Sequence, residues 1–289
     1  MDLSALHIFR TVVQENGVTR AAAKLNRVQS NVTTRIRQLE ESLGADLFIR
    51  DGRRLVLTPA GETLLPYAER LLALADEARH AIREDRPRGR LRLGTMESTA
   101  ASRLPPVLAA YHQRWPEVTL ELATGVTTAL IDDLRRFELD AALTARPLAS
   151  DALPPEVFDS VAVFTEALVL LTPRGQFPAA PGAAGPTLVA FERGCAYRSY
   201  AMRWCEQNGV RPARVLELGS YHAIVACVAA GAGIAVAPRS VLELARLDGE
   251  VDLHPLGELG QVDTLLVWRR GHFSAALNAL RGLLTQGAS

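Results

Sequence analysis

This sequence of 289 residues has few cysteines and a single lysine, and its formal net charge is zero. Three cysteines are too few for a disulfide-rich secreted scaffold, so they favour a reducing compartment. Lys24 is the single lysine, and 32 basic residues balance 32 acidic ones. Neither the net charge nor the arginine count therefore indicates a nucleic-acid partner. Apolar residues make up 48% of the chain, which excludes a largely disordered protein and, at about 100–200 residues per domain, predicts two domains.

Signatures of catalysis, metal binding and export are also missing. The sequence has no Gly-rich phosphate loop, no G-x-S-x-G turn and no H-E-x-x-H helix, so we expect no enzyme and no catalytic residue. Without histidines at paired spacing the cysteines predict no zinc site, and we expect no metal and no cofactor. Arg10 and Glu15 interrupt the first apolar stretch, which excludes a signal peptide there. The uncharged stretch 218–238 indicates a buried helix, a glycine turn and a strand; we expect a cytoplasmic protein that does not enter a membrane.

The first 58 residues show the pattern of three short helices followed by a hairpin. Apolar residues recur every three to four positions over residues 3–13, which predicts the first helix. Thr19 is expected to cap the second helix. The third runs over about residues 30–43, with Gly44 at a left-handed C-terminal cap. Asp51-Gly52 between two apolar runs indicates a tight hairpin, so this order predicts a winged helix-turn-helix.

One face of this segment has the chemistry of a DNA-reading surface. Residues 16–39 contain five basic residues and no acidic one, an asymmetry that phosphate contacts require. The third helix places short and forked hydrogen-bonding side chains opposite its apolar stripe, which suits the major groove, and arginines surround the hairpin tip. The alternative is a solvated polar face beside a charged hairpin. The predicted DNA-binding residues are Gln29, Ser30, Asn31, Thr33, Thr34, Arg35, Arg37, Gln38, Arg50, Arg53 and Arg54.

A long helix over about residues 59–85 follows, opened by Thr58 as N-cap and Pro59 at the first helical position. Its apolar residues have the spacing of a coiled-coil seam, which predicts dimerisation. An amphipathic helix packed on its own domain is the alternative. The seam consists of Leu64, Ala68, Leu71, Ala75, Ala78 and Ile82.

Strands and helices alternate from residue 90 to the end, which predicts an α/β domain with largely parallel sheets and two subdomains. The expected strands cover residues 91–94, 118–122, 139–143, 168–171, 188–191, 215–218, 234–237 and 265–268. Helices are expected between the strands, such as those over residues 103–115, 129–137, 197–208 and 221–230.

Residues 17–61, GVTRAAAKLNRVQSNVTTRIRQLEESLGADLFIRDGRRLVLTPAG, resemble the DNA-binding signature of LysR-type transcriptional regulators. The resemblance extends over the whole chain and includes the segment AAGAGIAVAP. GTMESTAASRLP and GCAYRSY are similar to a subgroup typified by YofA- and SoxR-like regulators. Where the family often has Ser-Gln-Pro-Ala, this chain has Val28-Gln29-Ser30-Asn31, and Thr33 stands for a frequent serine; these differences predict a different preferred operator.

The resemblance implies a definite architecture and a set of partners. The fold would be an N-terminal all-α winged helix-turn-helix (1–58), a long linker (dimerisation) helix (59–86) and a C-terminal α/β periplasmic-binding-protein-like (type II) effector domain (87–289). Subdomain I would comprise residues 90–162 and 268–289, and subdomain II residues 163–267. The implied partners are double-stranded DNA with an interrupted inverted repeat, a small-molecule effector, and further copies in a homodimer or homotetramer. We also expect a contact with RNA polymerase.

The effector cleft is expected where strands end and helices begin. The predicted lining is Ser98, Thr99, Cys195, Arg198, Ser220 and Tyr221. Hydroxyls and a forked guanidinium suit a small anionic metabolite, with Arg198 as its carboxylate partner, although Glu97 suits an anion only if it points away or contacts an amine. Ordinary helix capping by Ser98, Thr99 and Ser220 is the alternative reading.

Two other functions compete with this one. A thiol-redox-responsive regulator would use Cys195 and Cys205, which are ten residues apart, while Cys227 is most simply a buried apolar residue. A solute-binding protein or enzyme of the same α/β fold would use its N-terminal domain only for assembly. The basic face of the third helix argues against the second alternative.

Overall fold

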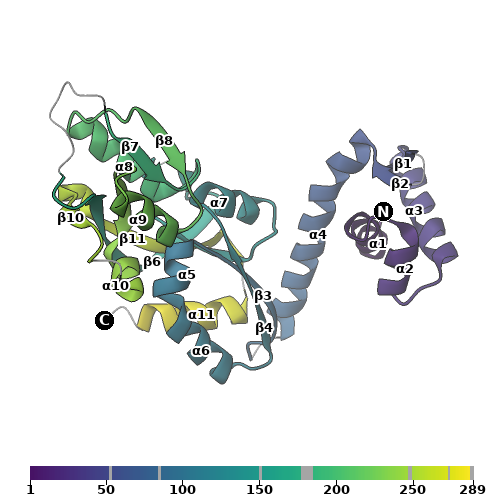
Figure 1. Cartoon of the computed structure of the whole chain (residues 1–289). Helices are drawn as coiled ribbons and strands as arrows, with labels where there is room; N and C mark the ends of the chain where they lie inside the picture. The colour runs from purple at the N-terminus through teal and green to yellow at the C-terminus, as the bar shows by residue number, and fades with distance from the viewer. Residues whose placement is uncertain are drawn as a thin grey trace. The chain divides into compact units, whose positions relative to one another are not determined.

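The computed structural model describes residues 1–51, 54–83, 86–149, 152–176, 185–246, 249–272 and 274–286. The chain divides into two compact units, Met1–Arg83 and Glu84–Ser289 (Figure 1). Each unit has a hydrophobic core of its own. No helix in these ranges is both long enough and apolar enough to cross a membrane.

The N-terminal unit is a winged helix-turn-helix that continues into a long helix. Its elements are α1 (Leu3–Gln14), α2 (Val18–Lys24), α3 (Gln29–Leu43), β1 (Phe48–Asp51), β2 (Arg54–Leu57) and α4 (Pro59–Arg83). Gly44 ends α3 in the left-handed conformation, with φ of 66°, as the sequence predicts. The prediction for Thr19 is wrong, because Gly17 is the N-cap of α2 and the Thr19 hydroxyl donates instead to Gln29 Oε1 at 3.3 Å.

Two different stripes of α4 are apolar. Leu64, Leu65, Ala68 and Leu72 pack on the core formed by α1, α2 and α3. Tyr67, Leu71 and Leu74 are exposed on another side of the helix. The predicted seam therefore divides: its first two residues serve the core of their own unit, and Leu71 belongs to an exposed apolar stripe. The side chain of Ile82 lies outside the described residues.

The C-terminal unit alternates strands and helices. Its first half contains β3 (Gly89–Thr95), α5 (Glu97–Ser102), α6 (Leu104–Arg114), β4 (Val118–Thr124), α7 (Thr127–Arg135), β5 (Ala141–Ala145) and β6 (Phe158–Thr172). Its second half contains β7 (Thr187–Ala190), α8 (Ala196–Gln207), β8 (Arg214–Glu217), α9 (Tyr221–Ala229), β9 (Ala235–Pro238), α10 (Arg239–Ala245), β10 (Asp252–Pro255), the 3-10 helix η2 (Gly257–Gly260), β11 (Gln261–Arg269) and α11 (Ala275–Gln286).

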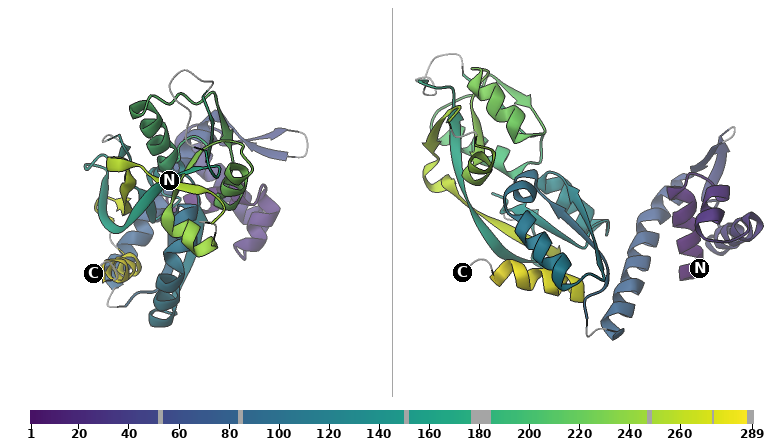
Figure 2. Two further views of the ribbon diagram at one scale, coloured as in Figure 1. Left: turned by 60° about the vertical axis from the view of Figure 1, so that its left-hand side comes forward. Right: turned by 60° about the horizontal axis from the view of Figure 1, so that its bottom comes forward.

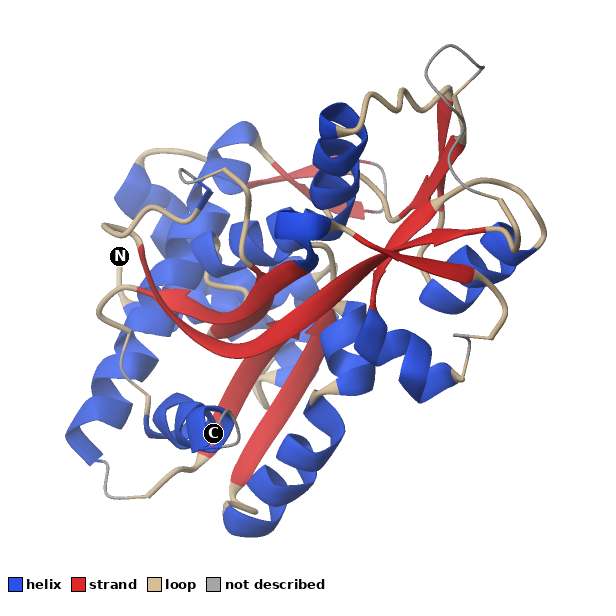
Figure 3. Ribbon diagram, turned by 90° about the vertical axis from the view of Figure 1, so that its left-hand side faces the viewer, coloured by secondary structure: helices blue, strands red, loops and turns tan. Residues whose placement is uncertain are grey.

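The main sheet of this unit is mixed, so the expectation of largely parallel sheets is wrong. Within the described ranges the strand order is β10-β6-β11-β5-β3-β4, with β9 also paired to β6, while β7 and β8 form a small parallel sheet. β3 pairs in parallel with β4 and β5. The other ladders of the main sheet are antiparallel, because β6 and β11 run in opposite directions between the two subdomains (Figure 3).

Each subdomain is closed by helices on its sheet. In the first, α11 packs beside α6, where Leu104, Leu277 and Leu280 share one core (Figure 2). The Tyr111 hydroxyl donates to the Ala276 carbonyl oxygen at 2.8 Å, which ties the two helices together. In the second, α8 and α9 cover β7 and β9 around a larger core.

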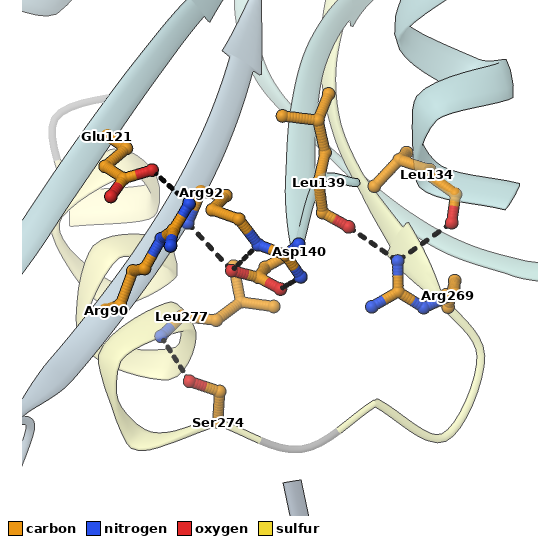
Figure 4. A network of polar contacts seen from close by, with 9 residues as sticks. All are labelled: Arg90, Arg92, Glu121, Leu134, Leu139, Asp140, Arg269, Ser274 and Leu277. Carbon is orange, nitrogen blue, oxygen red and sulfur yellow. Dashed lines mark hydrogen bonds and ion pairs between the residues drawn. The ribbon is translucent and has the colours of Figure 1, made fainter. Parts of the chain in front are cut away.

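Two arginines, the half-buried Arg92 and the buried Arg269, fix the ends of elements in the first subdomain (Figure 4). The Arg92 guanidinium donates to both carboxylate oxygens of Asp140, at 2.7 and 3.3 Å, and the Arg92 backbone N–H donates to the same group at 2.8 Å. Burial raises the pKa of Asp140, but the contacts with Arg92 outweigh it and lower that pKa overall. Arg269 donates to the carbonyl oxygens of Leu134 and Leu139, at 2.8 and 2.6 Å, and so satisfies backbone groups in the last turn of α7 and shortly after it.

Candidate functional site

The outer face of α3 carries the residues that the sequence predicts for DNA reading. Val32, Ile36 and Leu39 are buried in the core of the unit. The opposite face is exposed over Ser30, Asn31, Thr34, Arg35, Arg37 and Gln38. Thr33 differs from these, because it is half-buried and its hydroxyl donates to the Gln29 carbonyl oxygen at 3.0 Å. The helix therefore presents a continuous polar face with donors and acceptors suited to base edges.

The hairpin is held to α3 by a carboxylate that the sequence analysis overlooked. Glu40 Oε1 accepts hydrogen bonds from the backbone N–H groups of Leu47, at 2.9 Å, and Phe48, at 3.3 Å. These groups lie at the entry to β1, so Glu40 links the reading helix to the start of the hairpin. Arg50 and Arg54 lie in the two paired strands, but their side chains, and Arg53 entirely, lie outside the described residues.

The contact between the start of α4 and the loop before the hairpin explains the motif LTPAG. The Thr58 hydroxyl accepts from the Gly61 backbone N–H at 3.0 Å and donates to the Asp46 carbonyl oxygen at 2.6 Å, so Thr58 caps α4 as predicted. A Cβ atom on Gly61 would lie 2.2 Å from the Leu47 carbonyl oxygen. Only glycine lets α4 begin this close to the loop that leads into the hairpin.

A cavity of about 190 Å³ lies between the two subdomains of the C-terminal unit. It is smaller than the roughly 300–1,000 Å³ of sites for drug-sized ligands, so it suits a small metabolite. The lining residues are Met96, Glu97, Ser98, Thr124, Gly125, Val126, Thr127, Phe191, Glu192, Cys195, Tyr197, Gly219 and Tyr221.

The sequence predicts part of this lining. Ser98, Cys195 and Tyr221 lie in it, whereas Thr99 and Ser220 do not. Capping does not account for the hydroxyls, since Met96 is the N-cap of α5 and the Ser220 side chain makes no capping hydrogen bond. The segment from Thr124 to Thr127, at the end of β4 and the start of α7, was missed because it has no motif of its own.

Arg198 lies outside the cavity lining. Its guanidinium donates to Glu217 Oε1 at 2.6 Å and to the Phe191 carbonyl oxygen at 3.2 Å. Arg198 lies in the first turn of α8 and pairs with an acidic residue, so it is not placed as the carboxylate partner of a ligand in this cavity. The lining itself, within the part of the chain that the structure describes, includes no lysine, arginine or histidine.

Polar atoms in the cavity wall lack partners. Tyr197 is 3% exposed, and its hydroxyl makes no hydrogen bond with any described residue. Burial raises the pKa of Tyr197, although the nearby hydroxyls of Ser98 and Thr264 act in the opposite direction. Glu97 Oε2 is also buried without a partner among the described atoms. Burial raises the pKa of Glu97, while the charge of His222 and the Tyr221 backbone N–H lower it.

The two subdomains touch beside the cavity. The Thr128 backbone N–H donates to the Gly194 carbonyl oxygen at 3.2 Å, and the Tyr200 hydroxyl donates to the Arg146 carbonyl oxygen at 3.1 Å. Gly194 has φ of 96°, and a Cβ atom there would lie 2.0 Å from the Thr128 hydroxyl oxygen. The structure therefore shows the cleft closed by backbone contacts that require glycine at this position.

The cysteines have the environment of structural residues. Cys195 and Cys205 are buried, and burial raises the pKa of Cys195 and raises that of Cys205 to about 11. Cys195 precedes α8 and Cys205 lies near its end, so about 15 Å of helix separates them at 1.5 Å per residue. A disulfide between them would require α8 to unfold, and neither thiol has the lowered pKa of a redox sensor.

Comparisons with known proteins agree with this architecture. The model for the bacterial regulatory helix-turn-helix protein of the lysR family matches residues 3–62, and the model for the LysR substrate binding domain matches residues 84–289. The chain belongs to the LysR family of transcriptional regulators. It is thus a DNA-binding regulator with an effector-binding C-terminal domain, and the thiol-redox alternative is not favoured. The match over residues 3–62 also argues against a solute-binding protein whose N-terminal domain serves only assembly.

Relatives within the LysR family cover nearly the whole chain. The transcriptional regulator YusT of Bacillus subtilis is 36% identical over 99% of this chain and 96% of its own length. The regulator SoxR of an Arthrobacter species is 35% identical over 94% of this chain and 92% of its own.

Two solved structures share the fold. Full-length OxyR of Pseudomonas aeruginosa has a TM-score of 0.72 at 22% identity, and the comparison covers 99% of this chain and 98% of that one. CbnR complexed with its target DNA has a TM-score of 0.65 at 23% identity, with complete coverage of both chains.

Proposed function

We propose that this LysR-family chain reads its operator through the exposed face of α3 and responds to a small molecule in the cavity between its subdomains. The polar face of α3 is the observation that carries the proposal for DNA reading. Six hydrogen-bonding residues are exposed there, opposite a buried apolar stripe. The CbnR structure, which shares the fold, is a complex with target DNA, and this supports the assignment. The buried Glu97 Oε2 atom, which has no hydrogen-bond partner among the described residues, supports the second half, because a bound molecule could satisfy it.

The proposal also covers how two chains pair and where the protein acts. Pairing of two chains through the exposed stripe of α4 would bring two reading helices to an inverted repeat. Regulation then requires a contact with RNA polymerase and a location where DNA is available, the cytoplasm. We infer that the chain regulates without a catalytic step.

An Arg37→Ala substitution is expected to relax base preference. Arg37 is exposed in the middle of α3, where a guanidinium can bind guanine with two hydrogen bonds. Such a contact discriminates by about 1–3 kcal/mol, so the preference for one base should fall about 5- to 150-fold at the position it reads. Selection from a randomised operator library, followed by sequencing, measures this.

The matched control is Arg203→Ala, which removes an exposed arginine from α8 in the other unit. It should leave the selected sequences unchanged. An Arg37→Ala protein that selects the parental operator at every position would contradict the proposed docking.

A Glu40→Ala substitution is expected to weaken operator binding without touching the reading face. The change leaves the backbone N–H groups of Leu47 and Phe48 without their acceptor, so the hairpin loses its fixed angle to α3. Hydrogen bonds to a charged group are worth about 1.5 kcal/mol or more, which corresponds to about tenfold in operator affinity. Electrophoretic mobility shifts measure the affinity, and Glu41→Ala, the exposed neighbour, serves as the control that should bind normally.

A further inference from the structure

The charge of the cavity lining is negative. Glu97 and Glu192 both contribute carboxylates, and the described lining offers no basic side chain to oppose them. The arginine that the sequence offers for an anionic ligand, Arg198, is engaged by Glu217 at 2.6 Å outside the lining. A small carboxylate placed in this cavity would therefore meet like charge without a basic side chain in the lining, since His222, whose charge acts on Glu97, lies outside it.

Glu97 contributes a buried carboxylate oxygen that a ligand could satisfy. It stands at the start of α5, directly after β3, and its Oε2 atom is buried with no hydrogen-bond donor among the described residues. A buried carboxylate oxygen without a donor is costly in free energy, and that cost falls when a cation or a strong donor binds. Glu192 is exposed, so it adds negative charge at the side of the cavity that faces solvent.

Aromatic side chains form much of the remaining wall. Phe191 and Tyr221 pack with their ring centroids 4.9 Å apart and their planes tilted by 56°. Tyr197 lies in the same lining, 3% exposed, with its hydroxyl unpartnered by any described group. Aromatic faces attract cations within about 6 Å, and cages of such rings with a nearby carboxylate recognise alkylated ammonium groups.

We propose that the cavity binds a small organic ammonium ion, a protonated or N-alkylated amine, with Glu97 as its counter-ion and Phe191, Tyr197 and Tyr221 around its alkyl groups. This inference rests on the proposed function, in which the cavity is the effector site. The volume of about 190 Å³ suits a compact cation. The Tyr197 hydroxyl can bind a polar group on the same molecule.

The test compares ammonium compounds with carbon isosteres that lack the positive charge. The full chain is titrated calorimetrically with choline against 3,3-dimethylbutan-1-ol, and with glycine betaine against 3,3-dimethylbutyrate. Within each pair the shape is nearly constant and only the nitrogen charge changes. We expect at least one ammonium compound to bind and its isostere to bind about 10- to 100-fold more weakly, the usual range for a hydrogen bond or contact to a charged group.

Variants of Glu97 test whether its carboxylate causes the preference for a positively charged ligand. Glu97→Gln should lower the affinity for the ammonium compound about 10- to 100-fold and leave the affinity for its isostere unchanged, while Glu97→Asp should retain part of the preference. Glu206→Gln, on the exposed side of α8, is the control that should bind like the parent. Circular dichroism of each variant checks that it is folded.

Three outcomes would overturn the inference: equal binding of a cation and its isostere, binding of 3,3-dimethylbutyrate in preference to glycine betaine, or no binding by either ammonium compound. The preference for the anion would leave the proposed effector site standing and remove only the ligand class. Operator binding, measured on the same samples, reports separately on the DNA-binding half of the proposed function.

Discussion

A Leu71→Glu chain is expected to sediment as a monomer and to lose most of its affinity for the operator. Leu71 is 38% exposed and lies with Tyr67 and Leu74, at 56% and 57%, on the exposed apolar stripe of α4. A glutamate there would place a charge in the proposed contact between two helices, where its desolvation is costly. Losing simultaneous engagement of two half-sites should weaken binding by about 10²- to 10⁴-fold.

Analytical ultracentrifugation and mobility shifts measure the two effects. Glu62→Lys is the matched control, because it changes the charge of an exposed residue in the first turn of α4, outside the stripe. It should remain dimeric. A Leu71→Glu protein of unchanged mass in solution would assign dimerisation to another surface, since the core of the N-terminal unit does not depend on this side chain.

An Arg103→Met substitution is expected to destabilise the C-terminal unit by about 3 kcal/mol. Glu166 on β6 is 2% exposed, and it accepts from Arg103 Nε at 2.7 Å and from the Ser240 hydroxyl at 2.7 Å. Removing the guanidinium leaves a buried carboxylate with one neutral donor. The expected value is at the low end of about 3–5 kcal/mol for broken buried pairs, because the Arg103 side chain is 36% exposed and water can replace part of it.

Urea unfolding followed by tryptophan fluorescence isolates this effect. All three tryptophans, Trp115, Trp204 and Trp268, lie in the C-terminal unit, so the signal reports on that unit alone. The double variant Arg103→Met, Glu166→Leu should recover part of the loss, because it removes the charge as well as its partner. Equal loss in the single and double variants would show that the cost comes from packing and not from the unpaired carboxylate.

Local signals in the sequence predict the N-terminal unit closely. Gly44 and the pair Thr58-Pro59 act through their own backbone conformation and nearest neighbours, so they mark the end of α3 and the start of α4 correctly. Thr19 misleads because its hydroxyl has a competing partner, Gln29, ten residues away. Glu40 was missed for a similar reason, since the backbone N–H groups that donate to its carboxylate, those of Leu47 and Phe48, lie beyond the end of α3.

The C-terminal unit is harder to read because its decisive contacts are distant in sequence. The expected strand at 168–171 is the last part of β6, which begins at Phe158, and neither β10 nor α11 is among the elements that the sequence analysis names. Strand direction could not be predicted, because pairing of β6 with β11 joins residues about a hundred positions apart. Likewise, the pairing of Arg198 with Glu217 joins residues 19 positions apart, and no sequence motif predicts it.

The long ladder between β6 and β11 determines how occupancy of the cavity can be transmitted. The two strands are hydrogen bonded to each other from Gln261 to Arg269, so the subdomains cannot swing as on a loose hinge. A change in their angle must be absorbed as twist of this two-stranded ribbon, and the ladder already shifts register between Thr264 and Leu265. The Thr264 hydroxyl lies beside that of Tyr197 in the cavity wall. Amide hydrogen exchange at Thr264 and Leu265 should therefore differ between the effector-free and the effector-bound chain, whether or not DNA is present.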